Sequence, residues 1–406
     1  MYNALKKARI LLPAANVDPA KWAVVACDQF TAQPDYWTQA EAIVGDAPST
    51  LRLTLPEIYL SDSEARVPAI HAAMEDYLSR GVLSEAVDGF LLVERTTPSG
   101  IRPGLMVALD LDAYDYSAGS TSLIRATEGT VASRVPPRAK IRAGAKLELP
   151  HVMMLIDDPG CTVIEPLYAR RNELRSLYDF DLMLGGGHLR GWAVENGDTE
   201  GVFAAIDQLA ENCGGLLYAV GDGNHSLAAA KKCWLQIRES LTEAERENHP
   251  ARFALVELVN LACPALVFEP IHRILFNVDS ADLFAALRAH LREYGIEDAP
   301  GSDLFAFDRD SWLSFRSEQH PLHALQSFLD VYLAEHPEAE IDYIHGDDAL
   351  RSLVKSHPNA VGFMPRAFEK SELFGAIRRH GVLPRKTFSM GEATDKRYYM
   401  EARKIL

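Results

Sequence analysis

A glycine-bracketed turn, Gly221-Asp222-Gly223-Asn224-His225-Ser226, lies between an apolar strand pattern over Leu216–Val220 and a helical pattern. Free amides at the start of a helix favour an anion, phosphate most naturally, and glycines let a ligand approach the backbone. The Asp222 carboxylate can hold Mg²⁺ or accept a proton, and His225 can donate to a phosphate oxygen or act as an acid or base near neutral pH. The alternative interpretation is that Asn224 or Ser226 only caps the helix. The turn is neither a Walker A motif nor a dinucleotide fingerprint, because it lacks the Lys-Ser/Thr of the first and the third glycine of the second.

Two further segments place ionisable side chains close together. Glu269-Pro270-Ile271-His272-Arg273 follows a strand pattern, and its carboxylate and imidazole can form an acid/base pair. Residues 383–392 contain Arg385 and Lys386, which can grip a phosphate or a carboxylate. The alternatives are an exposed strand-end turn for the first segment and a basic surface loop for the second.

A third segment, Gly185-Gly186-Gly187-His188, is flexible enough for a mobile lid, although a plain connection is the preferred interpretation. All these segments combine glycine or proline with ionisable groups at the end of an element. We therefore expect them to converge with residues 221–226 on one pocket.

Residues 124–150 form a locally cationic stretch in an acidic chain. The stretch contains six Lys and Arg residues, among them Arg134 and Arg138, against two acids, Glu128 and Glu148. Charge runs are usually solvated, so a surface loop is the preferred interpretation, and a contribution to an anion pocket is the alternative.

The elements that must position these residues alternate between strand and helix patterns. Helix patterns are predicted over 63–80, 202–209, 281–294, 347–355 and 370–379, and strand patterns over 22–27, 90–94, 105–111, 151–156, 216–220, 341–344 and 360–364, with a hairpin over 253–260 and 265–268. The alternation predicts an α+β (mixed α/β) protein. The polar stretch 238–252 is the best candidate for a domain seam, which gives an N-terminal region 1–240 and a C-terminal α/β region 241–406.

Composition narrows the classes of partner. The chain has 406 residues, a formal net charge of −16, 48% hydrophobic and 24% charged residues, which is typical of a soluble globular protein. The acidic balance argues against nucleic acid, which requires clustered Lys and Arg. The five cysteines form no CxxC pair, no window approaches a membrane span, and the apolar run 10–12 is too short for a signal peptide. We expect a cytoplasmic protein with a small, phosphorylated ligand and no nucleic-acid or membrane partner; the oligomeric state is left open.

Six segments spread over nearly the whole chain carry a family resemblance: ILLPAANVDPAKWAVVACDQF, ATEGTVASRVPPR, ELPHVMMLIDDP, VGDGNHSLAAAK, VFEPIHR and LPRKTFSMGEATDKRYYMEARKI. On these segments the chain is identified as a member of the DUF1015 family, whose activity is not settled. The DGHHR-type turn of that family is similar to the phosphate-binding turn of the ParB/sulfiredoxin superfamily, which includes free-serine kinases, CTP-binding partition proteins and sulfiredoxins. The resemblance implies a ParB/sulfiredoxin-like nucleotide-binding N-terminal region and nucleotide phosphates, of ATP or ADP with Mg²⁺, at residues 222–226.

Two residues depart from the superfamily pattern. Asn224 stands where sulfiredoxins have a cysteine, which argues against their chemistry. Ser226 stands where an arginine often follows the histidine, so a cation for the phosphates has to come from Arg134, Arg138, Arg385 or Lys386.

The resemblance and the residues together lead to three hypotheses. The first is nucleotide-dependent phosphoryl transfer to a small hydroxylated metabolite, with Glu128 or Asp28 as the base. The second is a non-catalytic nucleotide- or metabolite-binding regulator, and the third is a metal-assisted hydrolase that uses Asp222, His225, Glu269 and His272. The predicted catalytic residues are His225, Asp222, Glu128 and Asp28, and the predicted cofactor-binding residues are Gly221, Gly223, Asn224, Ser226, Arg134, Arg138, Glu269, His272, Arg273, Arg385 and Lys386.

Overall fold

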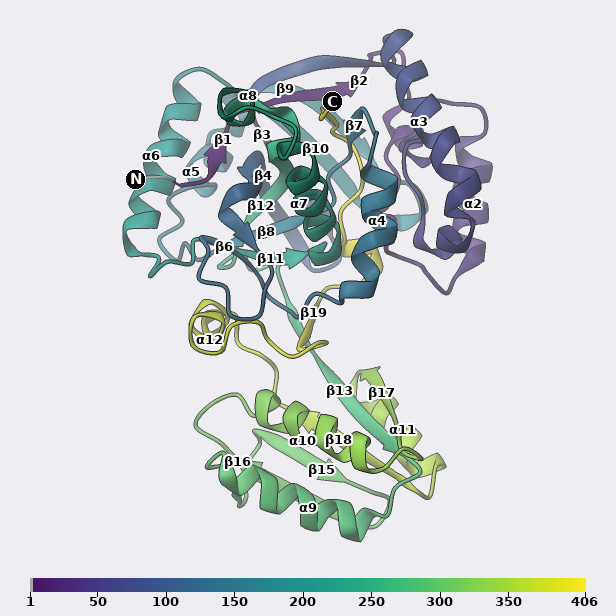
Figure 1. Ribbon diagram of the computed structural model, residues 1–406, viewed down its shortest axis with the longest axis vertical. Coiled ribbons are helices and arrows are strands. Elements are labelled where there is room, and N and C mark those ends of the chain that lie inside the picture. Colours follow the sequence, from purple (N-terminus) through teal and green to yellow (C-terminus); the bar gives the residue numbers. More distant parts are fainter. Residues whose placement is uncertain (1–2) are drawn as a thin grey trace. The chain divides into compact units, whose positions relative to one another are not determined.

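The computed structural model describes residues 3–406 and divides the chain into two compact units. The first unit comprises Met1–Leu266 together with Gly391–Leu406, and the second comprises Val267–Met390. The polar stretch expected to be a seam lies inside the first unit, where it contains the short helices α8 (Glu243–Asn248) and η7 (Pro250–Arg252). The units therefore differ in extent from the predicted regions 1–240 and 241–406. The fold is mixed α/β, as predicted (Figure 1).

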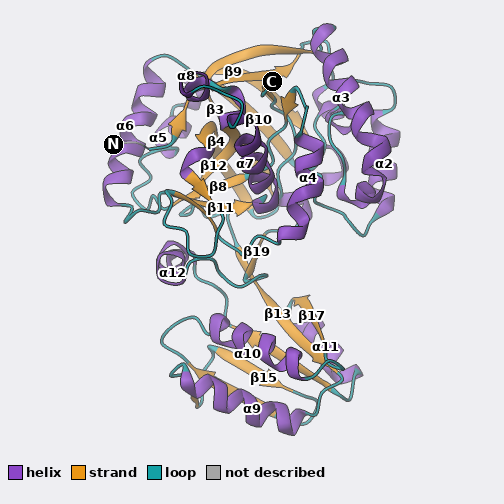
Figure 2. Ribbon diagram, viewed as in Figure 1, coloured by secondary structure: helices purple, strands orange, loops and turns teal. Residues whose placement is uncertain are grey.

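The first unit is built on one large mixed sheet (Figure 2). Its strands are β1 (Leu5–Lys6), β2 (Ala8–Pro13), β3 (Leu83–Thr97), β4 (Gly100–Asp110), β5 (Tyr114–Asp115), β6 (Ile124–Ala126), β8 (Met153–Ile156), β9 (Arg175–Asp181), β10 (His188–Val194), β11 (Tyr218–Asp222) and β12 (Phe253–Asn260). The strand order is β5-β6-β11-β8-β12-β4-β3-β10-β9, with β1 on β4 and β2 on β3. A separate ribbon pairs β7 (Leu147–Glu148) with β20 (Arg403–Lys404).

Helices cover both faces of this sheet. They are α1 (Pro19–Trp22), α2 (Pro34–Val44), α3 (Ser63–Ser79), α4 (Val135–Arg142), α5 (Glu165–Ala169), α6 (Gly197–Asn212) and α7 (Asn224–Arg238), with the 3₁₀ turns η1 (Thr50–Arg52), η2 (Glu57–Asp62), η3 (Leu111–Ala113), η4 (Ala132–Arg134), η5 (Arg171–Glu173), η6 (Met183–Gly185) and η9 (Ala393–Asp395). Alternate residues of β3 point to opposite sides: Leu91 and Val93 enter the core beneath α2 and α3, whereas Phe90 and Leu92 enter the core beneath α6 and α7.

The second unit is a smaller sheet with helices on both faces (Figures 1 and 2). Its strands are β13 (Phe268–Phe276), β14 (Glu297–Asp298), β15 (Leu304–Phe307), β16 (Trp312–Arg316), β17 (Glu340–His345), β18 (Ala360–Pro365) and β19 (Phe388–Met390), and its helices are α9 (Ser280–Glu293), α10 (Leu322–Glu335), α11 (Asp347–Ser356), α12 (Leu373–His380) and η8 (Lys370–Glu372). The order is β14-β16-β15-β18-β13-β17, with β19 on β13. Leu275 of β13 packs with α9 and α10, and its neighbour Ile274 packs with α11 on the other face.

Three predicted elements are wrong. Trp22–Cys27 is not a strand, because Asp18 caps the short helix α1 with Pro19 in its first turn, and only Val25 forms an isolated bridge. The predicted hairpin does not form either, since β12 pairs with β4 and β8 whereas β13 belongs to the other sheet. The cationic stretch is not a solvated loop: it contains β6 and α4, whose two prolines occupy the first turn, where no backbone donor is needed.

The helix over 63–80 forms as α3. It contains Pro68 in its interior, although a helix tolerates proline best in its first turn. The segment Glu269–Arg273 is also not a strand-end turn, because it lies within β13, where His272 is 2% and Arg273 0% exposed.

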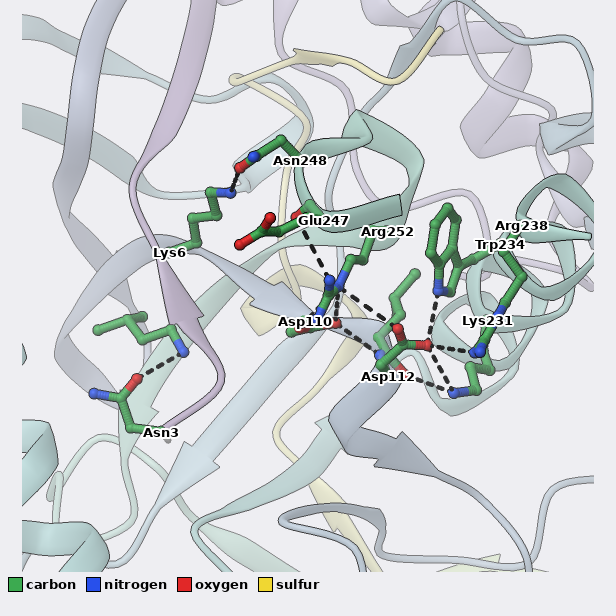
Figure 3. Close-up of polar contacts among 12 residues, drawn as sticks. Asn3, Lys6, Asp110, Asp112, Lys231, Trp234, Arg238, Glu247, Asn248 and Arg252 are labelled. Carbon is green, nitrogen blue, oxygen red and sulfur yellow. Dashed lines mark hydrogen bonds and ion pairs between the residues drawn. The ribbon is translucent and has the colours of Figure 1, made fainter. Parts of the chain in front are cut away.

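An ion-pair network fixes helix α7, which carries the candidate turn (Figure 3). The Asp112 carboxylate accepts a hydrogen bond from Trp234 Nε1 at 2.8 Å and from Arg238 Nη1 at 2.9 Å. Lys231 Nζ donates to the carbonyl of Leu111 at 2.8 Å. These contacts tie the second half of α7 to η3, which directly follows β4, and so fix the helix against the sheet.

No helix formed by residues 3–406 is long and apolar enough to span a lipid bilayer.

Candidate functional site

The candidate site lies where three strands meet at one edge of the first sheet. β6 and β11 are parallel, with Val220 opposite Ala126, so their carboxyl ends reach the same edge. This places residues 127–129 beside residues 221–223. β8 is antiparallel to β11, so its amino end, preceded by His151, starts at the same edge.

A cavity of about 140 Å³ opens at this edge. The lining residues are Asp28, Glu128, Gly129, Arg138, Asp222, Gly223, Asn224, His225 and Ser226. All of them except Gly129 belong to the set predicted from the sequence. The structure therefore brings together the 221–226 turn, the cationic stretch and the segment that contains Asp28.

Gly223 is the residue from which α7 starts. Its φ of +81° is left-handed, and a Cβ there would lie 3.1 Å from Val152 Cα, so the position requires glycine. Gly223 occupies the N-cap position, and no side chain caps the helix; the predicted capping role of Asn224 or Ser226 is therefore wrong. The Gly223 N–H donates to Asp222 Oδ1 and the Ser226 N–H to the carbonyl of Gly223, both at 3.0 Å, so the amides of the 15-residue helix α7 that remain available to a ligand are those of Asn224 and His225 among the described residues.

The His225 imidazole is held in one tautomer. Its Nε2 accepts a hydrogen bond from the backbone N–H of Val131 at 3.2 Å, so the proton of the neutral ring is on Nδ1. Burial, and then the neighbouring charges of Arg138 and Arg134, lower the pKa of His225 to about 4, and Asp28 opposes this effect. At pH 7 the ring is neutral, which corrects the expectation of an acid or base that titrates near neutrality. A neutral ring can donate to a phosphate oxygen through Nδ1.

Arg138 reaches the cavity because α4 packs closely on α7. The two helices lie side by side and meet through small residues, Ala139 on α4 with Ala228 and Ala229 on α7 (Figure 1). The Arg138 guanidinium pairs with the Glu57 carboxylate and also donates to the carbonyl of Arg134 at 2.7 Å. Its positive charge is therefore partly balanced by a carboxylate from η2.

Lys396 is a cation of the site that the sequence did not indicate. Its Nζ lies 3.3 Å from Asp222 Oδ2. Buried arginines hold the backbone just before it: Arg95 Nη2 donates to the carbonyl of Thr394 at 2.8 Å, and Arg102 Nη1 donates to that of Asp395 at 2.9 Å. Lys396 is a further positive charge beside the turn, in addition to Arg138, which is one of the four cations expected from the sequence and lines the cavity. No local pattern could reveal it, because the contact joins the last segment of the chain to β11.

A hydrogen-bonded chain lies behind the turn. Ser226 Oγ is 2.9 Å from His151 Nε2, and His151 Nδ1 is 2.9 Å from the Tyr399 hydroxyl. The same hydroxyl accepts from the backbone N–H of Cys27 at 3.2 Å. The chain thus links the turn to the residue before Asp28. His151 and Tyr399 were not predicted as site residues.

Five predicted site residues lie in the second unit. His272 Nε2 is 2.8 Å from the exposed carboxylate of Asp347. The buried Arg273 guanidinium donates to the carbonyls of Arg385 at 3.2 Å and Lys386 at 2.9 Å, so these two segments are neighbours. Glu269 lies on β13 opposite Ser389. The convergence of these residues with the first unit's cavity stays a prediction.

The triple glycine is a tight connection rather than an open loop. A Cβ on Gly186 would lie 2.5 Å from the Tyr398 ring, and one on Gly187 would lie 2.2 Å from the carbonyl oxygen of Thr96. His188 pairs with the carboxylates of Asp179 and Asp181, both at 2.6 Å. This packing agrees with a plain connection and not with a lid.

The oxygen ligands near the turn can be compared with those that Mg²⁺ requires. Within residues 3–406, no group of three or more His, Cys, Asp or Glu side chains is arranged to hold a metal ion. Mg²⁺ in phosphoryl-transfer sites commonly takes one or two carboxylates and completes its coordination with phosphate oxygens and water. The cavity contains carboxylates of this kind, among them Asp222.

Comparison with solved structures gives distant similarities. A free serine kinase variant in complex with AMP is 12% identical, with a TM-score of 0.41 over 74% of this chain and 92% of that one. A conserved hypothetical protein from Pyrococcus furiosus is 11% identical, with a TM-score of 0.37 over 73% and 95%. SbnI from Staphylococcus aureus is 9% identical, with a TM-score of 0.37 over 70% and 83%. Values this low give no basis for transferring residues or activities.

Comparison at the level of sequence gives one result. No functionally curated protein matches this chain. Residues 11–332 match the family described as "Protein of unknown function (DUF1015)". This range contains every residue that lines the 140 Å³ cavity. The chain belongs to the DUF1015 family.

Proposed function

We propose that the first unit binds the phosphates of ATP or ADP at residues 221–226 and transfers a phosphoryl group to the hydroxyl of a small metabolite. The observation that supports this proposal is the composition of the 140 Å³ cavity. A helix start, one cation (Arg138) and three carboxylates surround one space small enough for a phosphoryl group, and a second cation, Lys396, lies 3.3 Å from one of these carboxylates. We also propose that the first unit is related to the ParB/sulfiredoxin superfamily.

The carboxylates favour transfer over simple binding. A site that only binds an anion gains nothing from negative groups, since like charges 4 Å apart repel by about 4 kcal/mol at an effective dielectric constant of about 20. Asp222 pairs with Lys396, Asp28 accepts a hydrogen bond from Gln29 Nε2 at 3.0 Å, and both Asp28 and Glu128 line the same cavity. A carboxylate beside the phosphates is useful when it accepts the proton of an attacking hydroxyl.

Each residue then has a role. The α7 amides, the His225 Nδ1–H, Arg138 and Lys396 orient the phosphates and balance their charge. Glu128 or Asp28 accepts the proton of the acceptor hydroxyl, while the acceptor oxygen bonds to the terminal phosphorus of the nucleotide and the bond from that phosphorus to the bridging oxygen breaks, which releases ADP from ATP or AMP from ADP. Asp222 would hold Mg²⁺, which supplies further neutralisation of phosphate charge when bound.

The two alternatives have less support. A hydrolase of the predicted kind needs Asp222 and His225 of the first unit together with Glu269 and His272 of the second, and this convergence stays a prediction. His272 is also engaged with Asp347. A non-catalytic binder explains the cations and the helix start but not the carboxylates, and the experiment below separates it from a kinase.

The test measures transfer and binding separately in the full-length protein. ³¹P NMR follows ATP with Mg²⁺ and a panel of small hydroxylated acceptors, serine among them, and calorimetry measures the affinity for ADP. Glu128→Gln and Asp28→Asn should leave the ADP affinity within a few-fold, and one of them should lower turnover by about 10²- to 10⁴-fold, because it removes the general base. Glu211→Gln, an exposed position on α6, is the matched control and should change neither quantity.

If ADP binds and no acceptor is ever phosphorylated, the protein is a nucleotide-responsive binder. If neither ADP nor ATP binds, the assignment of the turn to nucleotide phosphates is wrong.

A further inference from the structure

The second unit contains a larger cavity, of about 660 Å³, within the range of small-molecule sites. The end of α9, the β16–α10 connection, α12 and residues 382–387 surround it. Every residue of its lining lies in Val267–Met390. It is therefore independent of the cavity at the 221–226 turn.

Three cationic or donor side chains line this cavity without protein partners. The imidazoles of His323 and His380 face each other, with ring centroids 5.6 Å apart and planes inclined by 22°. Arg379, next to His380 on α12, also lines the cavity. Among residues 3–406, no hydrogen bond or ion pair engages these three side chains. Burial, then His323 and Arg379, lower the pKa of His380, and a bound anion would oppose this effect.

The lining also contains acidic groups. Glu372 is occupied by a two-point ion pair with Arg366, at 2.9 and 2.7 Å. Glu297 and Glu318 are exposed, as are Arg316, which donates to the carbonyl of Pro300 at 3.0 Å, and the three side chains of the cluster themselves. The cluster differs from these groups in gathering three donors without a partner in the described part of the chain, two of them stacked rings, at one place, and such donors favour an anionic ligand.

Part of the lining is apolar. Ile296, Leu322, Phe368 and Leu383 belong to it and are at most 6% exposed, so each offers only a small part of its side chain to the cavity. A free phosphate ion would make no use of these apolar groups. A ligand that has an apolar body beside its charged group would cover both kinds of surface.

The lining is built to stay in place. The buried Arg273 guanidinium holds the carbonyls of Arg385 and Lys386, which fixes the turn that carries Leu383. His320, whose pKa is lowered to about 4 by burial and then by Arg366, is neutral at pH 7 and uses both nitrogens: Nε2 donates to the carbonyl of Arg366 at 3.0 Å and Nδ1 accepts from Leu322 N at 3.3 Å. A preformed cavity loses little conformational entropy when a ligand binds.

We infer that this cavity is a second ligand site, which binds a small molecule with a carboxylate or phosphate group next to an apolar body. Arg379, His323 and His380 hold the oxyanion, and Ile296, Leu322, Phe368 and Leu383 cover the apolar part. The inference goes beyond the proposed phosphoryl transfer and does not depend on it, since it requires neither nucleotide nor any residue of the first unit. Residues 383–387 take part in this cavity through Leu383, Pro384 and Thr387, which line it, and not through Arg385 and Lys386.

The test is calorimetric titration of the full-length protein with four probes. Phenylacetate and phenyl phosphate combine a charged group with an apolar body, and acetate and inorganic phosphate provide the charged group alone. Phenylacetate should bind more tightly than acetate, or phenyl phosphate more tightly than inorganic phosphate. Which of the two phenyl compounds binds tells whether the site prefers a carboxylate or a phosphate. Arg379→Ala and the double variant His323→Ala/His380→Ala should each weaken this binding by about tenfold or more, because each removes hydrogen bonds to a charged group.

Two controls make the outcome specific. Arg378→Ala changes the neighbouring exposed arginine of α12, which does not line the cavity, and should bind the probe like the wild type. Lys396→Ala alters the first unit's site and should also have no effect. The inference is overturned if neither phenyl probe binds at about 10 mM, the weak limit for a specific small ligand. It is also overturned if Arg379→Ala binds as the wild type does, or if Lys396→Ala rather than Arg379→Ala abolishes binding.

Discussion

At the scale of single residues, the environment of His225 decides what this side chain can do. Histidine in water titrates near pH 6.5, which is why a histidine in a turn indicates acid/base chemistry. In the folded protein Arg134 and Arg138 lie close to the ring, and the Val131 amide occupies its acceptor nitrogen. The same residue that the sequence indicates as an acid/base group is therefore a neutral donor at pH 7.

This environment predicts a pH dependence of stability. The pKa of His225 falls from an ordinary 6.5 to about 4 on folding, so between these values the unfolded chain binds a proton that the folded chain does not. The contribution of this residue to the free energy of unfolding is complete above pH 6.5 and is lost as the pH falls toward 4. Urea denaturation of the wild type and His225→Gln between pH 4 and 7.5 checks it, and the variant should show a shallower loss. Equal slopes for the two proteins would contradict the assignment.

At the scale of elements, the strand–turn–helix unit β11–α7 is the device that builds the site. The parallel pairing of β11 with β6 brings Glu128 to it, the packing of α4 on α7 brings Arg138, and Asp112 anchors α7 on its other side. The sharpness of the connection depends on Gly223, which alone can adopt the left-handed conformation so close to Val152.

Gly223→Ala should therefore lower the free energy of unfolding by about 1–3 kcal/mol, because a left-handed non-glycine residue is strained and its Cβ would press on the Val152 backbone. ADP affinity should fall as well, since the start of α7 would shift. Gly201→Ala is the matched control: Gly201 lies inside α6 with nothing within 4 Å of its Cβ position, so alanine should stabilise by about 0.5–1 kcal/mol. Denaturant unfolding measures both; equal effects of the two substitutions would refute the argument.

At the scale of the whole molecule, the first unit is discontinuous in sequence. Its main part ends at Leu266, the second unit follows, and Gly391–Leu406 belongs to the first unit again. Buried charges hold this last segment in place. Arg397 Nη1 lies 2.6 Å from Glu257 Oε2, its Nη2 pairs with Glu401, and Arg403 Nε lies 2.7 Å from Glu148 Oε1. The segment also delivers Lys396 to Asp222.

Arg397→Met should destabilise the first unit by about 3–5 kcal/mol, because it removes the closest cation from two buried carboxylates and, among the described residues, leaves Glu257 with Arg102 at 3.8 Å and Glu401 with only the Tyr178 hydroxyl. Arg175→Met removes an exposed pair with Glu195 and should cost at most about 1 kcal/mol. Calorimetric unfolding of the full chain compares the two variants. A loss for Arg397→Met no larger than that for Arg175→Met would show that the buried cluster does not hold the segment.

How far the sequence predicts this molecule depends on whether a feature is local. The helices α3, α9 and α11 and the strands β17 and β18 lie close to their predicted ranges, because apolar periodicity and end signals act within a few residues. Predictions failed where the chain context decides. Residues 253–260 and 265–268 were predicted to be the two strands of a hairpin, yet the second strand is Phe268–Phe276 and belongs to the other sheet, which depends on partners far away in sequence.

The sequence by itself determined the mixed α/β class, the family and the glycine turn that ends β11. The alternation of strand and helix patterns, the similarity of short segments and the residue types of a turn all depend on residues close together in the chain. It also contained eight of the nine residues around the 140 Å³ cavity as separate candidates. Only the tertiary structure decided that Lys396 pairs with Asp222, that His225 is neutral and that Arg273 is a buried support. These properties arise from burial and from contacts between distant segments, and the order of strands in the sheet that creates those contacts is not encoded in any local pattern.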